Sequence, residues 1–188
     1  WLLRLSEDDE AMRAVHELVG IYERNRDELT EKDYGLFESA LRAAPIWITS
    51  AASTHSIPMV PGGFDLVVVD EATQCSITNL LPLLFRGKRL AVIGDENQLR
   101  AIPNVRTTEE NLLAKKHDVE DWVGIFGHCG QDVYTAGVES IPKRTAGVVT
   151  LREHYRSHPQ IIGFANRDVY RGRLELRRPL KGFKEEDG

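Results

Sequence analysis

A short aliphatic run that ends in two carboxylates constrains the fold of this chain more than any other feature. Residues 66–69, within the stretch FDLVVVDEATQCS, are four apolar residues, three of them β-branched. Such a run is typical of a strand buried on both faces of a parallel sheet. Asp70 and Glu71 follow at once, and an unpaired charge inside a sheet is prohibitively costly. We therefore expect both carboxylates at the carboxyl edge of the sheet, where open α/β sheets bind their ligands.

Composition sets the broad class of the protein. The chain has 188 residues, 41% hydrophobic and 28% charged, which suits one soluble globular domain or one and a part. No apolar run approaches the roughly 20 residues of a membrane span, and the first ten residues do not resemble a secretory signal. Because the chain begins with Trp1 rather than Met, we expect that it begins mid-protein. Two cysteines provide neither a disulfide framework nor a zinc spacing, so we expect a cytoplasmic or nuclear protein.

The net charge of −5 hides an asymmetry along the chain. Residues 1–40 carry 5 basic and 11 acidic side chains, whereas residues 142–184 carry 11 basic and 3 acidic ones. The second stretch could face phosphate groups, or it could simply be a solvated surface.

Hydrophobic periodicity predicts helices in residues 1–43. Ser6 and the acidic residues after it indicate a helix start, and apolar residues then recur at helical spacing: Met12, Val15, Leu18, Val19 and Tyr22. A second helix is expected from about Thr30 to Ala43, with Pro45 ending it. We interpret both as packing helices, although their dense charge also permits an exposed hairpin.

The order of predicted strands and helices in residues 44–147 is typical of a parallel α/β sheet. We expect strands at 46–50, 66–69 and 89–93, and a helix at 77–85 between the last two. Residues 104–147 contain five glycines and are expected to be irregular. From residue 148 a further strand at 148–151 and a helix from Pro159 to about Tyr170 are expected. The predicted domains are therefore 1–43, 44–147 and 148–188.

Asp70 and Glu71 are suited to phosphoryl-transfer chemistry. Magnesium takes one or two protein carboxylates and keeps much of its hydration shell, so Asp70 is a candidate metal ligand. Glu71 could then orient or deprotonate an attacking water. The alternative is a strand-end pair that serves as a helix N-cap.

A second predicted strand also ends in polar residues, in the stretch GDENQL, 24 residues after Asp70. Gly94 would permit a tight exit from the strand, Asp95 could bind a partner side chain or a metal-bound water, and Gln98 could sense a terminal phosphate without adding charge. Two adjacent parallel strands would direct these groups into one crevice. Alone, this stretch could be an ordinary turn.

The third landmark is the stretch HYRSHP, residues 154–159. Arg156 could neutralise charge on a transferring γ-phosphoryl group, and Tyr155 offers a flat face to a base. On its own, a Tyr-Arg pair is commonly a core aromatic beside a surface cation.

In order, DEATQ, GDENQL and HYRSHPQIIGFANRDVYRGRL resemble motifs II, III and IV of superfamily 1 helicases, most closely the subgroup with the nonsense-mediated-decay and Okazaki-fragment-processing helicases. Residues 44–53 also resemble the strand and nucleic-acid-contacting loop that precede motif II. The resemblance covers about residues 44–103 and 148–176. It implies an α/β fold, namely part of a RecA-like P-loop NTPase domain, with a parallel sheet flanked by helices, and the start of a second such domain.

The resemblance also implies a role for each motif residue. Asp70 would help to hold Mg²⁺ and Glu71 would activate the water that attacks ATP. Gln74 and Gln98 would couple the γ-phosphate to the nucleic-acid side, with support from Asp95. From the second domain, Arg156 would reach the phosphate and Tyr155 would stack near the base. The implied nucleic-acid contacts are Thr49, Ser50 and Ser53.

Two departures from the family pattern carry expectations of their own. The family continues motif III with two prolines, whereas Leu99 is followed here by Arg100-Ala-Ile-Pro103, which predicts a looser loop. The chain also has no G-x-x-x-x-G-K-[ST] phosphate-binding loop, since its only Gly-Lys pair, Gly87-Lys88, precedes Arg89.

We therefore expect an interior part of an ATP-dependent helicase, inactive alone. It would use ATP and Mg²⁺, bind single-stranded DNA or RNA and no membrane, pair with the rest of its parent chain and be a monomer. The alternative is a degenerate NTPase-like module that binds other proteins.

Overall fold

The computed structural model describes residues 9–24, 33–142 and 147–177. The chain divides into two compact units, Trp1–Glu139 and Ser140–Gly188, and each is described by itself. Among the described residues, no helix has the length and apolar character needed to cross a membrane.

The first unit begins with a helical hairpin made of α2 (Asp9–Glu23) and α3 (Tyr34–Ala43). Both predicted helices are confirmed within the described residues, and the proposed cap at Ser6 lies outside them. The buried stripe of α2 differs from the prediction: it is Ala11, Ala14, Leu18 and Ile21, whereas Met12 and Val19 are 37% and 47% exposed. The two alanines leave room for α3, so large apolar residues alone did not mark the contact face.

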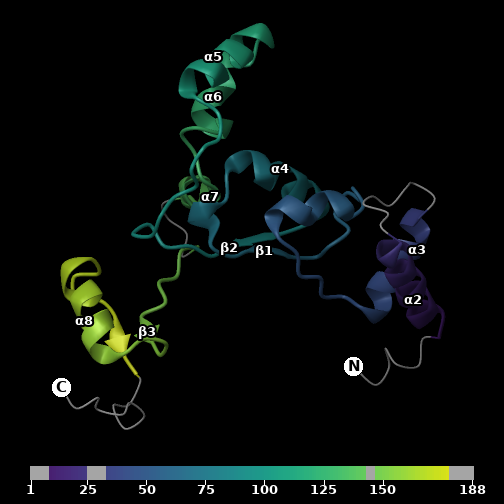
Figure 1. Ribbon diagram of the computed structural model, residues 1–188, viewed down its shortest axis with the longest axis horizontal. Coiled ribbons are helices and arrows are strands. Elements are labelled where there is room, and N and C mark those ends of the chain that lie inside the picture. The colour runs from purple at the N-terminus through teal and green to yellow at the C-terminus, as the bar shows by residue number, and fades with distance from the viewer. Residues whose placement is uncertain (1–8, 25–32, 143–146, 178–188) are drawn as a thin grey trace. The chain divides into compact units, whose positions relative to one another are not determined.

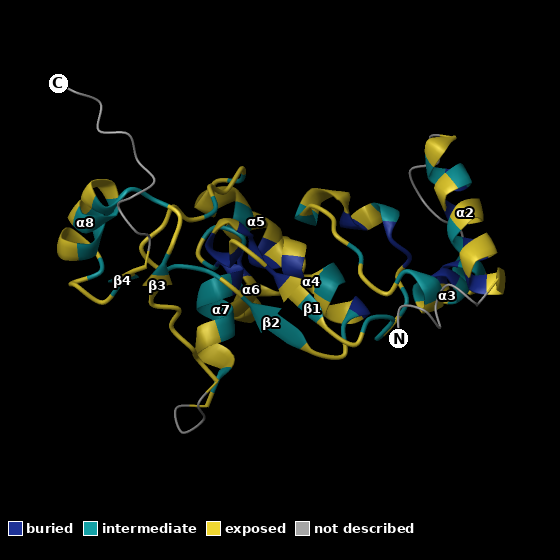
Figure 2. Ribbon diagram, turned by 90° about the horizontal axis from the view of Figure 1, so that it is seen from below, coloured by how far each residue is buried: buried dark blue, intermediate teal, exposed yellow. Residues whose placement is uncertain are grey.

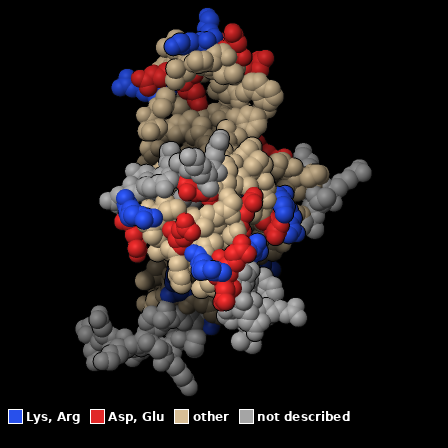
Figure 3. Space-filling model, turned by 90° about the vertical axis from the view of Figure 1, so that its right-hand side faces the viewer, with Lys and Arg blue, Asp and Glu red and all other residues tan. Residues whose placement is uncertain are grey.

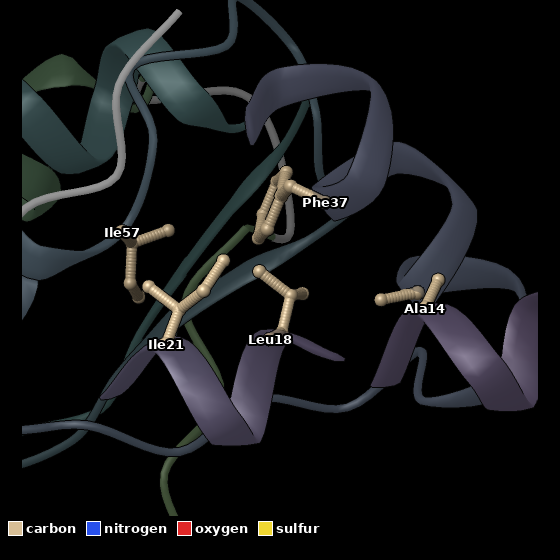
Figure 4. Close-up of a cluster of buried hydrophobic side chains, with 6 residues drawn as sticks. Ala14, Leu18, Ile21, Phe37 and Ile57 are labelled. Carbon is tan, nitrogen blue, oxygen red and sulfur yellow. The ribbon is translucent and has the colours of Figure 1, made fainter. Parts of the chain in front are cut away.

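Phe37 is the centre of the hairpin's core. Its side chain is fully buried and faces Leu18 and Ile21 of α2, as Figure 4 shows. Its ring meets Trp47 and Phe64 edge-on, at centroid distances of 5.1 and 6.0 Å. The hairpin therefore packs on the segments that lead into the sheet, and the alternative of an exposed hairpin is wrong.

A parallel strand pair follows, as the sequence predicted. Strand β1 (Val67–Val69) pairs with β2 (Leu90–Val92), with Val67 opposite Leu90 and Val69 opposite Val92. Helix α4 (Ile77–Arg86) connects them, which confirms the predicted strand-helix-strand order (Figure 1). An isolated parallel bridge between Phe64 and Gly87 lengthens the pairing at its start.

The burial of these strands is lower than predicted. Val69 is buried, but Leu66 and Val68 are about half exposed, so the expected burial of the run on both faces is wrong. The cause is that the described residues give this sheet two strands only. The expected strand at 46–50 does not form, and its Ile46 and Ile48 are 81% and 95% exposed. Figure 2 shows β2 in the intermediate colour along its length.

Helices also occupy the segment that was expected to be irregular. They are α5 (Thr107–Lys116), α6 (Glu120–Phe126) and α7 (Val133–Ser140). Gly137 shows why the glycines of this segment do not indicate irregular structure. A Cβ at this position would lie 3.3 Å from the Val92 side chain. This glycine lets α7 approach β2 closely instead of ending a helix.

The second unit contains a smaller strand-helix-strand arrangement. Strands β3 (Glu153–His154) and β4 (Glu175–Leu176) are parallel, and α8 (Pro159–Asp168) lies between them in the chain. The predicted helix is confirmed. The strand expected at 148–151 is wrong, because pairing starts only at Glu153, beyond the end of that segment, and Val149 and Leu151 are about four-fifths exposed.

Charged side chains of both signs share the surface. On the face shown in Figure 3, acidic and basic residues are interspersed. In the second unit, each acidic side chain of residues 142–177 pairs with an arginine: Glu153 with Arg177, Asp168 with Arg167, and Glu175 with Arg152 and Arg177. The basic excess of the sequence is therefore partly neutralised within this unit.

Candidate functional site

The candidate site lies where β1 and β2 end. Asp70 and Glu71 follow β1, and Gly94 and Asp95 follow β2 soon after it. Pairing continues past the strands, since Ile93 N–H donates to the Val69 carbonyl at 2.8 Å and Ala72 N–H donates to the Ile93 carbonyl at 2.9 Å. The structure therefore brings the DEATQ and GDENQL segments to the same edge.

Glu71 has an unusual backbone conformation. Its φ of 51° and ψ of 42° place it in the left-handed region, which costs a non-glycine residue roughly 1–2 kcal/mol. Glu71 occupies the N-cap position of the short 3-10 helix η3 (Ala72–Gln74), yet its side chain makes no capping hydrogen bond. Instead, its N–H donates to Asp70 Oδ1 at 3.0 Å. The geometry does not support the alternative in which Glu71 serves as a cap, and both carboxylates are exposed.

Asp95 organises the second exit. Its Oδ1 accepts the Asn97 N–H at 3.0 Å, and its Oδ2 accepts from Gln98 Nε2 at 3.3 Å. This turn holds the Gln98 amide beside a carboxylate while Gln98 itself stays exposed. Asp95 and Gln98 thus act as a connected pair.

The loop after Gln98 is tied down rather than loose, contrary to what the missing prolines predicted. Ala101 N–H donates to the Thr73 carbonyl at 2.8 Å, which joins the loop directly to DEATQ. Arg100 Nη1 lies 3.4 Å from Asp132 Oδ2, and the Asp132 side chain is only 4% exposed. Asp132 Oδ1 also accepts the Thr135 N–H at 2.7 Å at the start of α7. An ion pair with α7 therefore anchors the loop.

Tyr134 is a neighbour of the site that the sequence did not reveal. A Cβ on Gly94 would lie 2.7 Å from Tyr134 Cδ2, so Gly94 is needed because the ring packs against it. Burial, and then the nearby Glu96, Asp95 and Asp132, raise the pKa of Tyr134. Gly94 has no positive φ, so the close approach of Tyr134, and not a left-handed backbone, is what requires a glycine here. No pattern in the sequence links Tyr134 to this glycine.

The residues at this edge fit a magnesium ion held mostly by non-protein ligands. Asp70 presents an exposed carboxylate, and the adjacent Glu71 is exposed as well. The described residues contain no group of three or more His, Cys, Asp or Glu side chains that could form a full protein cage. Magnesium suits such a place, because it takes one or two carboxylates together with water and phosphate oxygens.

The predicted nucleic-acid residues cluster at the start of another 3-10 helix, η2 (Ala51–Ser56). Ser50 is its N-cap: Ser50 Oγ accepts the Ser53 N–H at 3.2 Å and donates to Ser53 Oγ at 2.9 Å. Thr49, Ser50 and Ser53 are all exposed. Small hydroxyl residues and N–H groups at a helix start are common contacts for a phosphate backbone.

Tyr155 and Arg156 lie in the second unit, directly after β3, and both are exposed. Tyr155 donates its hydroxyl to the Glu153 carboxylate, whose Oε1 also accepts from Arg177 Nε at 3.1 Å. The Glu153 carboxylate raises the pKa of Tyr155, and this hydrogen bond, with Arg177, lowers the pKa of Glu153. The convergence of Arg156 with Asp70 and Gln98 stays a prediction.

The two histidines of HYRSHP shape the turn that carries Arg156. His154 Nε2 accepts the Ser157 N–H at 2.9 Å, and His158 Nδ1 accepts the Gln160 N–H at 3.2 Å as the N-cap of α8. Pro159 then occupies the first turn of the helix, where its missing N–H costs nothing.

A groove of about 620 Å³ lies away from these residues, between α5 and α6. Its lining is mainly apolar, with Leu113, Trp122 and Phe126 among its residues. None of the predicted site residues lines it, so the groove is no part of the candidate site.

Comparison with known proteins identifies the family of this chain. Residues 4–103, more than half of the chain and including α2 and α3, match the family described as AAA domain. The chain is similar to helicase SEN1 of Saccharomyces cerevisiae, at 27% identity over 87% of this chain and 7% of that protein. It is also similar to the ATP-dependent helicase MG140 of Mycoplasma genitalium, at 27% identity over 82% of this chain and 15% of that protein.

A third relative is the DNA replication ATP-dependent helicase/nuclease DNA2 of Gallus gallus, at 27% identity over 73% of this chain and 12% of that protein. The chain thus spans a small part of the length of each relative. The matched AAA domain and these helicase relatives support the resemblance to superfamily 1 helicases. The chain belongs to the AAA-domain family and, within it, to the superfamily 1 helicases of the Sen1 and nonsense-mediated-decay type.

Proposed function

We propose that this chain is part of an ATP-dependent helicase or translocase that couples Mg-ATP hydrolysis to movement on single-stranded DNA or RNA. The observation that carries the proposal is the paired edge of β1 and β2, which brings Asp70 and Glu71 beside the Asp95–Gln98 turn. The relatives named as ATP-dependent helicases support it.

Each side chain at this edge has a role in the proposed reaction. Asp70 would hold Mg²⁺, which neutralises charge on the phosphates when it is bound. Glu71 would take a proton from the water that attacks the γ-phosphorus, while the bond to the β,γ-bridging oxygen breaks and ADP leaves. Arg156, from the second unit, would stabilise the charge on the transferring group.

The loop after Gln98 offers a route from the nucleotide to the nucleic acid. Gln74 and Gln98 would sense the γ-phosphate, with Asp95 orienting Gln98. The hydrogen bond from Ala101 to the Thr73 carbonyl means that a shift of DEATQ moves this loop as well. Thr49, Ser50 and Ser53 would contact the strand, and Tyr155 would stack near the base of the nucleotide.

The rival is a degenerate NTPase-like module that binds other proteins. The absence of a G-x-x-x-x-G-K-[ST] loop from the 188 residues favours it superficially. However, a degenerate site has no chemical reason to keep Asp70, Glu71, Gln74, Gln98 and Arg156 together.

The test is ATP hydrolysis with and without single-stranded DNA or RNA, measured on the longest natural protein that contains these residues and on the 188-residue chain. We expect nucleic acid to stimulate the longer protein and the 188-residue chain to be inactive. A longer protein with a complete upstream domain and no ATPase activity would favour the interaction module. Activity that ignores both DNA and RNA would indicate an NTPase with another substrate.

A further inference from the structure

Arg86, the last residue of α4, is a buried cation with an unusual set of partners. The residue is 3% exposed. Its Nε donates to the Pro58 carbonyl at 3.0 Å, and its Nη2 donates to the carbonyls of Thr54 and Ile57 at 2.9 and 2.6 Å. Its Nη1 donates to the Pro82 carbonyl at 2.9 Å. Four of the five N–H groups of a guanidinium are thus used on backbone carbonyls.

This arrangement requires an arginine. Burial lowers the pKa of Arg86, which shows that desolvation opposes its charge. The charge is tolerated because the planar guanidinium spreads it over several hydrogen bonds in a fixed geometry. A lysine ammonium has three donors on one atom and could not reach carbonyls spread over Thr54, Ile57 and Pro58.

Three of the four carbonyls that Arg86 binds, those of Thr54, Ile57 and Pro58, belong to the end of η2 and the residues after it. The other end of η2 starts at Ser50, the N-cap, and carries Ser53. A second anchor holds the same end, since the Tyr22 hydroxyl of α2 donates to the Ser56 carbonyl at 2.8 Å. The orientation of the exposed Ser50 and Ser53 therefore depends on a turn whose backbone carbonyls accept hydrogen bonds from Arg86 and Tyr22.

The helix that carries Arg86 begins directly after DEATQ. Its N-cap is Ser76, two residues after Gln74, and the helix ends at Arg86 itself. One helix of ten residues thus connects the nucleotide-side motif to the loop predicted to bind nucleic acid. A change in the position of DEATQ would be transmitted to η2 through the hydrogen bonds of Arg86.

We propose that Arg86 is a positioning residue that couples the nucleotide site to the strand-binding loop, by fixing η2 to α4. This inference rests on the proposed function. Arg86 touches neither substrate in this account; it sets the position of Ser50 and Ser53 for nucleic acid. Disorganising the loop should weaken nucleic-acid binding and leave the chemistry at Glu71 in place.

The test uses Arg86→Met and Arg86→Lys in the longest natural protein that contains these residues. ATP hydrolysis is titrated with a single-stranded oligonucleotide. We expect the half-saturating oligonucleotide concentration to rise about tenfold in Arg86→Met, because the loop is no longer pre-organised. The increase should be smaller in Arg86→Lys, and the basal rate without oligonucleotide should stay within about twofold of the parent.

The matched control is Lys88→Met, which removes a cation two residues away whose partner, Asp65, is on the surface. It should leave the half-saturating concentration unchanged. Tyr22→Phe should raise this concentration slightly, because it removes one of the two anchors without creating a cavity.

The possible outcomes distinguish a failure of the coupling role of Arg86 from a failure of the proposed function. An unchanged half-saturating concentration in both Arg86 variants would overturn the coupling role, and so would a parallel fall of basal and stimulated rates with a lower Tm. If neither variant folds, Arg86 is a general stability residue and the inference is wrong. If the unmodified protein does not respond to nucleic acid at all, the proposed function fails instead.

Discussion

Removing the Asp132 carboxylate should destabilise the anchor of the loop after Gln98 by a predictable amount. The substitution Asp132→Ala deletes two interactions: the N-cap bond to the Thr135 N–H at 2.7 Å and the ion pair with Arg100 at 3.4 Å. An N-cap is worth typically about 1 kcal/mol. The Arg100 side chain is 59% exposed, so its pair adds about 0.5 kcal/mol, in the range of surface ion pairs.

The expected loss for Asp132→Ala is therefore about 1.5 kcal/mol in the free energy of unfolding. Asp132→Asn keeps an acceptor for Thr135 and should lose about 0.5 kcal/mol, which is the ion-pair part. Arg100→Ala should lose about 0.5–1 kcal/mol, because the Arg100 side chain is 59% exposed and water screens the pair. In the double variant, the coupling energy should be about 0.5 kcal/mol.

Urea unfolding of the 188-residue chain at 25 °C, followed by circular dichroism, measures all four values. The m-value should not change, since none of the substitutions alters the surface that unfolding exposes. A loss below about 0.5 kcal/mol for Asp132→Ala, together with no coupling to Arg100, would refute the anchor.

Three further experiments test other parts of the structure. Phe37→Ala should cost about 3–5 kcal/mol in urea unfolding, and Phe37→Leu under about 1.5 kcal/mol, because Phe37 is fully buried; equal losses would contradict the packing. Glu71→Gly should raise the free energy of unfolding by about 1 kcal/mol by relieving the left-handed backbone, whereas no gain would argue against strain. Because the pKa of Glu153 is lowered in the folded protein, the ionised carboxylate stabilises the fold above its unfolded pKa, and this stabilisation is lost as pH falls through the folded pKa. NMR titration of Glu153 should show the lowered pKa. The substitution Tyr155→Phe should bring the pKa of Glu153 closer to the unfolded value.

The sequence predicted the part of the fold that depends on local pattern. Residues 66–69 and 89–93 are aliphatic runs that end in polar residues, and they form the parallel pair β1 and β2. Helices α4 and α8 follow from their apolar spacing and, for α8, from Pro159 in its first turn. The placement of Asp70 and Asp95 at one edge follows from the parallel pairing alone.

The parts that the sequence did not predict depend on contacts between distant residues. Residues 46–50 have the apolar pattern of a strand, but a strand needs a neighbour, and the described residues provide none. The packing of Gly94 against Tyr134 and of Gly137 against Val92 has no local signature. No pattern in the sequence marked Arg86, which binds the carbonyls of Thr54 and Ile57, 32 and 29 positions earlier in the chain.

The proposed role of Glu71 is to activate the water that attacks ATP at the edge of β1 and β2. Its most direct test is ATP binding and steady-state turnover by Glu71→Gln in the longest natural protein that contains these residues. ATP binding should be retained and turnover should fall at least about 100-fold, as expected for loss of a general base. A variant that hydrolyses ATP at the normal rate would contradict this role.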